Sequence, residues 1–247
     1  MLIDLHVHSN YSEGFESTLA DIAEKCRERG ISGALLAECD TVPDPEEVAR
    51  LSKELNFKFF IGVDIDGADG RLIAVPSDPS DERFRSQSWR GDDDDTSVRD
   101  VIDVMEAIDG AVIATHPYLD DGGPFLGDKI YKVEGLAAVE VICGVSEHLS
   151  NDLALEAAVA KGLGTVGGSD TGPEGQRLGR FATVFAQDIS TQEELVEALN
   201  AGLCWAAEIK DPGERPRSQR RRRGGGGGGG GRGHGGGGGG RSNGNRR

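Results

Sequence analysis

The chain has 247 residues and a formal net charge of −16, and its charges are divided unevenly between a long body and a short C-terminal tail. Ten arginines and no acidic residue lie in residues 215–247, so residues 1–214 hold 17 basic residues (27 minus 10) against 43 acidic ones, a charge near −26. No run approaches the roughly 18 apolar residues needed to cross a bilayer, and no leader-like segment opens the chain, which argues against membrane insertion and secretion. The four cysteines form no CxxC pair, which is typical of a reduced, cytoplasmic protein.

Strand-like apolar runs alternate with helical patterns along the body. In the first half, strands are expected at residues 2–8, 34–38, 59–65 and 72–75, and helices at residues 19–29 and 45–55. The polar residues 78–97 predict a long loop. In the second half, helices are expected at residues 98–108, 149–161 and 192–200, and strands at residues 111–115, 138–142, 165–168, 182–185 and 204–209.

This alternation predicts an α/β fold in which helices surround a parallel sheet. Seven or so units over about 210 residues favour a closed or nearly closed barrel over an open doubly wound sheet, which is the alternative. We therefore expect one barrel domain over residues 1–211. From Pro212 onward, Arg, Gly, Pro, Ser and Asn dominate the composition and no core can form, so residues 212–247 are predicted to be a disordered tail.

Polar side chains end several of the predicted strands. His6 and His8 lie two residues apart on the first strand, so their side chains point to the same side and can bind one ion. Active sites of parallel barrels gather at the C-terminal ends of the strands. The other strand ends carry Glu38, Cys39, Asp64, His116, Glu140 and Asp170. Because borderline divalent ions bind imidazole together with carboxylate, this pattern predicts a metal site.

Six segments of the body resemble, in order and spacing, the motifs of the PHP (polymerase and histidinol phosphatase) family of metal-dependent phosphoesterases. They are DLHVHSNYSEG, ALLAECDT, IGVDI, ATHP, AAVEVIC and GGSDTG. The resemblance implies a distorted, TIM-like (β/α)7 barrel that holds up to three metal ions at its C-terminal face and hydrolyses phosphate esters.

The match to the family's ligands is incomplete. The identical positions are His6, His8, His116 and Asp170. Glu13 stands where Asp or His is usual, Asp64 where a bridging Glu is usual, and Cys39 where a His is usual. Arg71 and Gly172 stand where the family has further histidines, so two ligands are missing.

The resemblance therefore implies one well-preserved metal site, built from His6, His8, Asp64 and Asp170. A second site would join His116 to Asp64, and a third would lie near Glu13 and Cys39. The expected cofactors are one or two divalent ions, chosen from Zn, Mn, Fe and Mg. Cys143 is interpreted as a small buried apolar residue.

Three arginines of the body are candidates for phosphate contacts. Arg71 would place a positive charge and a bidentate fork where a phosphate sits, which makes it an expected catalytic residue beside Asp64 and His116. Arg177 and Arg180 follow the GGSDTG segment and could contact phosphate at the same face. Their alternative interpretation is that they are ordinary surface arginines.

The arginines of the tail indicate a nucleic-acid partner. A flexible cation can contact phosphates and stack on unpaired bases, so RNA or single-stranded DNA binding is expected from Arg220, Arg221, Arg222, Arg223 and Arg232. The alternatives are a solubility or self-association segment, or a tail that lies on the acidic body of its own chain.

The predicted function is that of a metal-dependent phosphoesterase, of the phosphatase or 5′–3′ exonuclease type. Its substrate would be a phosphorylated metabolite, a nucleotide or an oligonucleotide end. The alternative is a catalytically weakened PHP barrel that serves as an RNA-binding, single-stranded-DNA-binding or scaffold protein. A metal-dependent amidohydrolase, which also begins with a His-x-His strand, is a third possibility.

Overall fold

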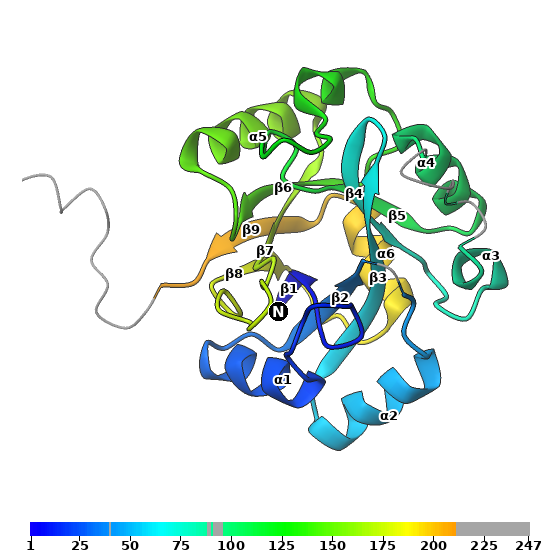
Figure 1. Cartoon of the computed structure of the whole chain (residues 1–247), viewed down its shortest axis with the longest axis vertical. Coiled ribbons are helices and arrows are strands. Elements are labelled where there is room, and N and C mark those ends of the chain that lie inside the picture. Colours follow the sequence, from blue (N-terminus) through cyan, green and yellow to red (C-terminus); the bar gives the residue numbers. More distant parts are fainter. Residues whose placement is uncertain (40, 88–89, 91–95, 211–247) are drawn as a thin grey trace, which may run out of the picture. The chain divides into compact units, whose positions relative to one another are not determined.

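Nine strands of the described residues form one continuous sheet, which curves into a nearly closed barrel in the computed structural model (Figure 1). The structure describes residues 1–210 except residues 40, 88–89 and 91–95, so the predicted tail and its arginines lie outside the described residues. The strands are β1 (Leu2–Val7), β2 (Gly33–Glu38), β3 (Lys58–Gly67), β4 (Gly70–Val75), β5 (Ala111–Ala114), β6 (Ala138–Cys143), β7 (Gly164–Gly168), β8 (Phe181–Phe185) and β9 (Cys204–Glu208).

The sheet runs in the order β7-β6-β5-β4-β3-β2-β1-β8-β9. Its two end strands meet at a seam, where the backbone N–H of Ala206 in β9 donates to Thr165 Oγ1 in β7 at 3.3 Å. This side-chain contact brings the ends of the sheet together, so the C-terminal ends of the parallel strands surround one shared region.

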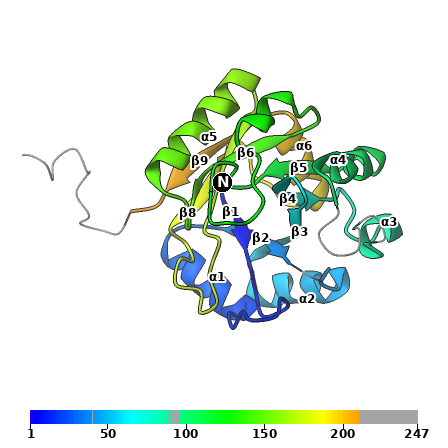
Figure 2. The same ribbon diagram turned by 45° about the horizontal axis from the view of Figure 1, so that its top comes forward.

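Helices cover the outside of this sheet, as Figures 1 and 2 show for α1, α2, α4 and α5. Their bounds are Leu19–Glu28 (α1), Pro45–Leu55 (α2), Glu82–Arg85 (α3), Val98–Ala107 (α4), His148–Lys161 (α5) and Gln192–Asn200 (α6), with a 3-10 helix η1 at Gly127–Lys132. Capping boxes begin three of them, at Thr18, Ser97 and Thr191, where a hydroxyl and the carboxylate three residues later satisfy free backbone amides. None of the helices in the described part of the chain has the length and apolarity that crossing a bilayer requires.

The expected strands and the five long helices all occur within two residues of their predicted bounds. The expectation of a parallel sheet is wrong for β3 and β4, because only Ala68 and Asp69 join them and two residues form a hairpin but no crossover. The pairs β4–β5, β1–β8 and β8–β9 are antiparallel as well. All nine expected strands occur in the described residues, but the expected count of seven β/α units is not confirmed. The short helices α3 and η1 lie where no helix is predicted.

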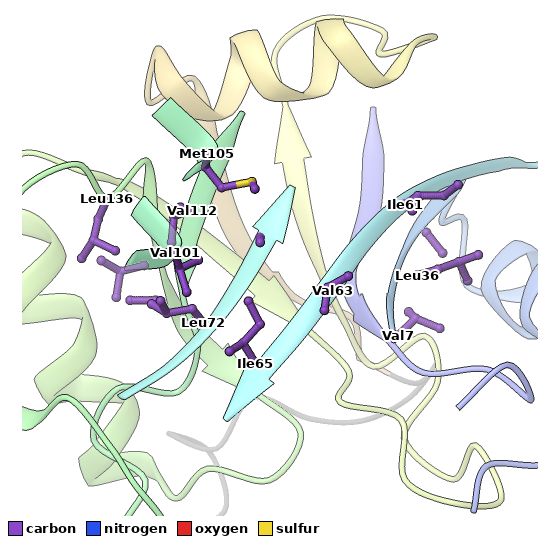
Figure 3. Close-up of a cluster of buried hydrophobic side chains, with 14 of the residues drawn as sticks. Val7, Leu36, Ile61, Val63, Ile65, Leu72, Val101, Met105, Val112 and Leu136 are labelled. Atoms are coloured by element: carbon purple, nitrogen blue, oxygen red, sulfur yellow. The ribbon is translucent and has the colours of Figure 1, made fainter. Parts of the chain in front are cut away.

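Two hydrophobic clusters fill the two faces of the sheet. The helix-side cluster contains Val7, Leu36 and Val63 from the strands (Figure 3), together with side chains of α1, α2, α4 and α5. The barrel-core cluster contains Ile3 and Leu5 from β1 together with side chains of α6. Burial of both faces explains why the strands are almost continuously apolar.

Strand β1 changes its alternation before it reaches the histidines. Asp4 pairs with Ala34 and Val7 with Leu36, so β1 carries one residue more than β2 over this stretch. Ile3 and Leu5 therefore point into the barrel core while Val7 packs on the helix side. Because the extra residue shifts the parity, His6 and His8 turn inward at the C-terminal end of the strand.

Candidate metal centre

The two histidines of β1 face a carboxylate of β3. The rings of His6 and His8 have centroids 5.1 Å apart, and both are almost fully buried. Asp64 Oδ2 lies 3.6 Å from His6 Nε2 and 3.9 Å from His8 Nε2. These separations leave room for a cation between the three groups, since they exceed those of direct hydrogen bonds.

Glu140 in β6 fixes the orientation of His6. Its Oε1 lies 3.0 Å from His6 Nδ1, and its Oε2 accepts the backbone N–H of His116 at 3.0 Å. When His6 Nδ1 carries the proton and donates to Glu140, Nε2 is left with a free lone pair directed at Asp64. Metal-binding histidines are commonly held by a carboxylate in this way.

His116 and Asp170 complete the cluster from the ends of β5 and β7. Both have a positive φ, 25° for His116 and 42° for Asp170, which costs non-glycine residues about 1–3 kcal/mol. Asp170 N–H donates to His6 O at 2.8 Å, and the Asp170 carboxylate lies 3.8 Å from His8 Nε2 and 3.9 Å from His116 Nε2. Strain of this kind is concentrated at functional sites, and here it aims both side chains at the pair of histidines.

The electrostatics of the cluster favour a positive charge at its centre. Burial opposes a charged imidazole, but Glu140 and Asp170 outweigh it and raise the pKa of His6 well above its usual range. Burial likewise opposes a charged Asp64, yet the adjacent His6, followed by the charges of His8 and His116, lowers the pKa of Asp64 to about 2. A proton on His6 can supply the positive charge that the carboxylates require, and a divalent cation would supply it in the proton's place.

Two groups of side chains in the described residues can hold a cation, with all ligand atoms of a group within 4.8 Å of one another. One group is His6, His8 and Asp64, and the other is His6, His116, Cys143 and Asp170. His6 Nε2, Asp64 Oδ1 and His116 Nδ1 are buried and have no hydrogen-bond partner. Because buried polar atoms without partners are costly, these three fit the role of metal ligands.

Cys143 is the member of these groups that the sequence interpretation missed. Glu140 pairs with Val166 and Ile142 with Gly167, so β6 carries an extra residue before Cys143. Strict alternation would place Glu140 and Cys143 on opposite faces, and the bulge brings them to the same face. The apolar run of β6 contains no pattern that locates the extra residue, so Cys143 could not be assigned to the site from the sequence.

The residues expected at a third site belong to neither ligand group of the described residues. Cys39 Sγ lies 3.6 Å from His8 Nδ1, on the edge of the ring opposite Nε2, so it contacts the histidine from behind. Glu13 is exposed and belongs to neither ligand group of the described residues. Glu38 is fully buried, and its carboxylate accepts hydrogen bonds from Ser9 and Ser12.

Arg71 lies at the rim of a small pocket of about 190 Å³ over the cluster. Its guanidinium donates to both carboxylate oxygens of Asp121 at 2.9 and 3.0 Å and, through Nε, to Asp66 at 2.8 Å. Asp66, Asp121, His8, Asp64, His116 and Asp170 line the same pocket, with Leu119 and Val145. Three of the five N–H groups of Arg71 are used in these contacts, so two carboxylates hold its guanidinium at the rim of the pocket.

Arg177 contacts the cluster and Arg180 does not. Arg177 Nε donates to the backbone oxygen of Asp170 at 2.5 Å, and its Nη2 lies 3.4 Å from Asp170 Oδ1. A Cβ placed at Gly172 would come within 3.1 Å of the same Nη2, so Arg177 occupies space beside the position where the PHP family has a histidine. Arg180 is exposed, with its guanidinium 6.0 Å from the ring of Phe181.

Replacing Gly168 by Ala is expected to lower the free energy of unfolding by about 3 kcal/mol, the upper end for inserting a methyl group into a packed core. The new Cβ would overlap His6 Cβ and lie 2.9 Å from the His6 backbone nitrogen and 2.8 Å from Glu140 Oε1. Urea denaturation measures the change. Gly62→Ala in β3 is the comparison, because its nearest neighbour would be 3.1 Å away and the loss should be smaller. Equal losses in the two variants would contradict tight packing at Gly168.

Part of the chain matches the model of a known protein family. Residues 148–204 match the family model described as PHP-associated. This segment contains Asp170 and Arg177 but none of the histidines of the cluster. No curated protein sequence matches the chain.

Solved structures show the same fold over most of the body. A candidate metal-dependent phosphoesterase from Bifidobacterium adolescentis is similar over 80% of this chain and 95% of its own, with a TM-score of 0.56 and 18% identity. An amidohydrolase from Chromobacterium violaceum, with bound sulfate and no metal, is similar over 85% of this chain and 98% of its own, with a TM-score of 0.58 and 16% identity. The lesion-specific endonuclease PfuEndoQ from Pyrococcus furiosus is similar over 83% of this chain and 58% of its own, with a TM-score of 0.60 and 16% identity. The body therefore shares its fold with these proteins. In this chain the PHP-associated segment begins after β6.

Proposed function

We propose that the body is a metal-dependent hydrolase of phosphate esters, with a phosphorylated metabolite, a nucleotide or an oligonucleotide end as its substrate. The observation that carries the proposal is the set of buried ligand atoms without partners, His6 Nε2, Asp64 Oδ1 and His116 Nδ1, beneath one pocket. The similarity to a candidate metal-dependent phosphoesterase and to an endonuclease supports this class of reaction.

Within this proposal each side chain has a role at the pocket. His6, His8 and Asp64 would hold one divalent ion, and His116 and Asp170 would contribute to a second. Bound ions of this kind polarise phosphoryl oxygens and lower the pKa of a coordinated water towards neutrality. Arg71 would place its positive charge at the rim beside the phosphate. Arg177 would offset the charge of Asp170 and keep its side chain in place.

The positions of Glu13 and Cys39 favour two ions over three. Neither residue belongs to a ligand group of the described residues, and Arg177 lies where Gly172 leaves space. The ions are expected to be Zn, Mn, Fe or Mg. Two further statements remain predictions from the sequence: that the tail binds RNA or single-stranded DNA, and that the protein is cytoplasmic.

The double variant His6→Ala, His8→Ala tests this function. Elemental analysis of wild-type protein purified without chelator should find about two ions per chain, and the double variant should lose the first ion, which His6 and His8 would hold. Hydrolysis of phosphate monoesters, nucleotides and short oligonucleotides should fall by more than about 10²-fold, since even the partners behind metal ligands contribute 10–100-fold.

An exposed histidine provides the matched control. His148→Ala lies at the start of α5 outside both ligand groups and should keep ions and activity. Wild-type protein without ions would refute the proposal and leave a barrel that binds nucleic acid or acts as a scaffold. Stoichiometric ions with turnover of amides but of no phosphate ester would instead indicate an amidohydrolase.

A further inference from the structure

We infer that the Cys143 thiolate is the third protein ligand of the second ion and makes that site selective for thiophilic metals such as zinc. This inference rests on the proposed metal-dependent function and specifies the chemistry of one of its two sites. The first site has only imidazole and carboxylate ligands, so the two ions would differ in kind.

A count of ligand atoms requires Cys143. Both ligand groups include His6, but its Nδ1 is engaged by Glu140, and the single free nitrogen, Nε2, can bind one ion only. Nε2 lies 3.6 Å from Asp64, which assigns it to the first ion. The second ion then keeps His116, Asp170 and Cys143, and without the cysteine it would have two protein ligands.

The surroundings of Cys143 differ from those of the other buried cysteines. Cys26 packs in the helix-side cluster and Cys204 in the barrel-core cluster, as small apolar residues do. Cys143 is 2% exposed yet belongs to neither cluster, and its Sγ lies 3.9 Å from Asp170 Oδ2. The bulge in β6 therefore places a sulfur among charged groups at the end of the strand, where an apolar side chain would gain little.

The chemistry of this ligand set selects the metal. Thiolate is a soft ligand that favours zinc, cobalt and iron, whereas carboxylate and water alone suit magnesium and manganese. Binding converts the Cys143 S–H bond into a sulfur–metal bond and releases one proton to solvent, with no change of oxidation state. One cysteine, one histidine and one carboxylate leave a coordination position open, as in catalytic zinc sites.

Cobalt(II) titration of the metal-free full chain tests the inference, because thiolate coordination gives an intense near-ultraviolet charge-transfer absorption that imidazole and carboxylate do not give. The wild type should develop this absorption as about one of two cobalt ions binds. Cys143→Ser should lose it, retain one cobalt ion, and bind zinc at the second site more weakly by at least about 100-fold. Circular dichroism checks that Cys143→Ser is folded. Cys143→Ala serves as a second variant, because it introduces no hydroxyl group.

Two further variants make the result specific. Cys204→Ser, another buried strand cysteine, and Cys39→Ser, beside His8, should both keep the absorption. Loss of the absorption in Cys39→Ser alone would overturn the assignment of Cys143. Bound cobalt without charge-transfer absorption would overturn this inference but leave the proposed function intact, whereas no bound cobalt would overturn both.

Discussion

Replacement of Asp64 by Asn is expected to lower kcat/KM for phosphate-ester hydrolysis by roughly 10²–10³-fold, the range for removing one preorganised charge from an active site. Asp64 faces both histidines of β1, and its Oδ1 is buried without a partner. An amide keeps the shape of the side chain but removes the charge and one of the two ligand oxygens. The first ion should then be lost from the purified protein, which elemental analysis measures beside the kinetics.

Asp66→Asn is the matched control for this substitution, because it lies two residues further along β3. Its carboxylate is 62% exposed and contacts Arg71, which Asp121 continues to hold. The control should keep its ions and lose less than about tenfold in kcat/KM, as expected for an exposed ion pair. Equal losses of kcat/KM at the two positions would indicate that the overall negative charge of the pocket, and not coordination of an ion by Asp64, matters for the reaction.

Asp64→Glu should distinguish ligand geometry from charge. The resemblance to PHP proteins implies a glutamate here, so the pocket of such proteins accommodates one methylene more. In this chain Asp64 Oδ2 is already 3.6 Å from His6 Nε2. The longer side chain keeps the charge but must shift its oxygens, so we expect it to bind the ion and to retain more activity than the amide.

Sequence reasoning could predict that the polar side chains at the ends of the strands lie close together. His6, His8, Asp64, His116 and Asp170 are far apart in the chain, and a barrel brings the ends of its strands to one face. This rule needs only the position of each strand, and the apolar runs locate the strands within two residues. It holds although four strand pairs are antiparallel, because the strands that carry the histidines and Asp170 keep their direction.

The features that sequence reasoning missed depend on single-residue irregularities or distant pairings. Cys143 faces the cluster because of one extra residue in β6, and a shift of one residue reverses the face of a side chain. Cys39 contacts His8 at Nδ1, the nitrogen that does not face Asp64. Its position follows from that of Glu38, the preceding residue, which accepts hydrogen bonds from hydroxyl groups in the segment after β1. The ion pair between Arg71 and Asp121 joins residues 50 positions apart in the chain, and no local sequence pattern predicts it.

Replacement of Glu140 by Gln is expected to weaken zinc binding by about 10–100-fold, although Glu140 touches no ion in the proposed arrangement. The carboxylate accepts two N–H groups, from His6 Nδ1 and from the His116 backbone. Glutamine has one acceptor oxygen. If the oxygen serves His116, the amide NH₂ donates to His6 Nδ1 and forces the proton onto Nε2, where it blocks coordination. If the oxygen serves His6, two N–H groups oppose each other in a buried site, which costs about 1–3 kcal/mol.

Nitrogen-15 NMR of the metal-free protein, at a pH above the raised pKa of His6 so that the ring is neutral, reads the His6 tautomer directly, and a chelator competition measures the zinc affinity. Glu38→Gln is the control, because it changes an equally buried glutamate whose partners include the hydroxyl groups of Ser9 and Ser12. A hydroxyl can accept as well as donate, so the amide at residue 38 finds partners and the affinity for zinc should stay close to that of the wild type. If Glu140→Gln kept both the Nδ1–H tautomer and the wild-type affinity, Glu140 would serve only to hold His116, and the orientation of His6 would have to come from the bulge in β1.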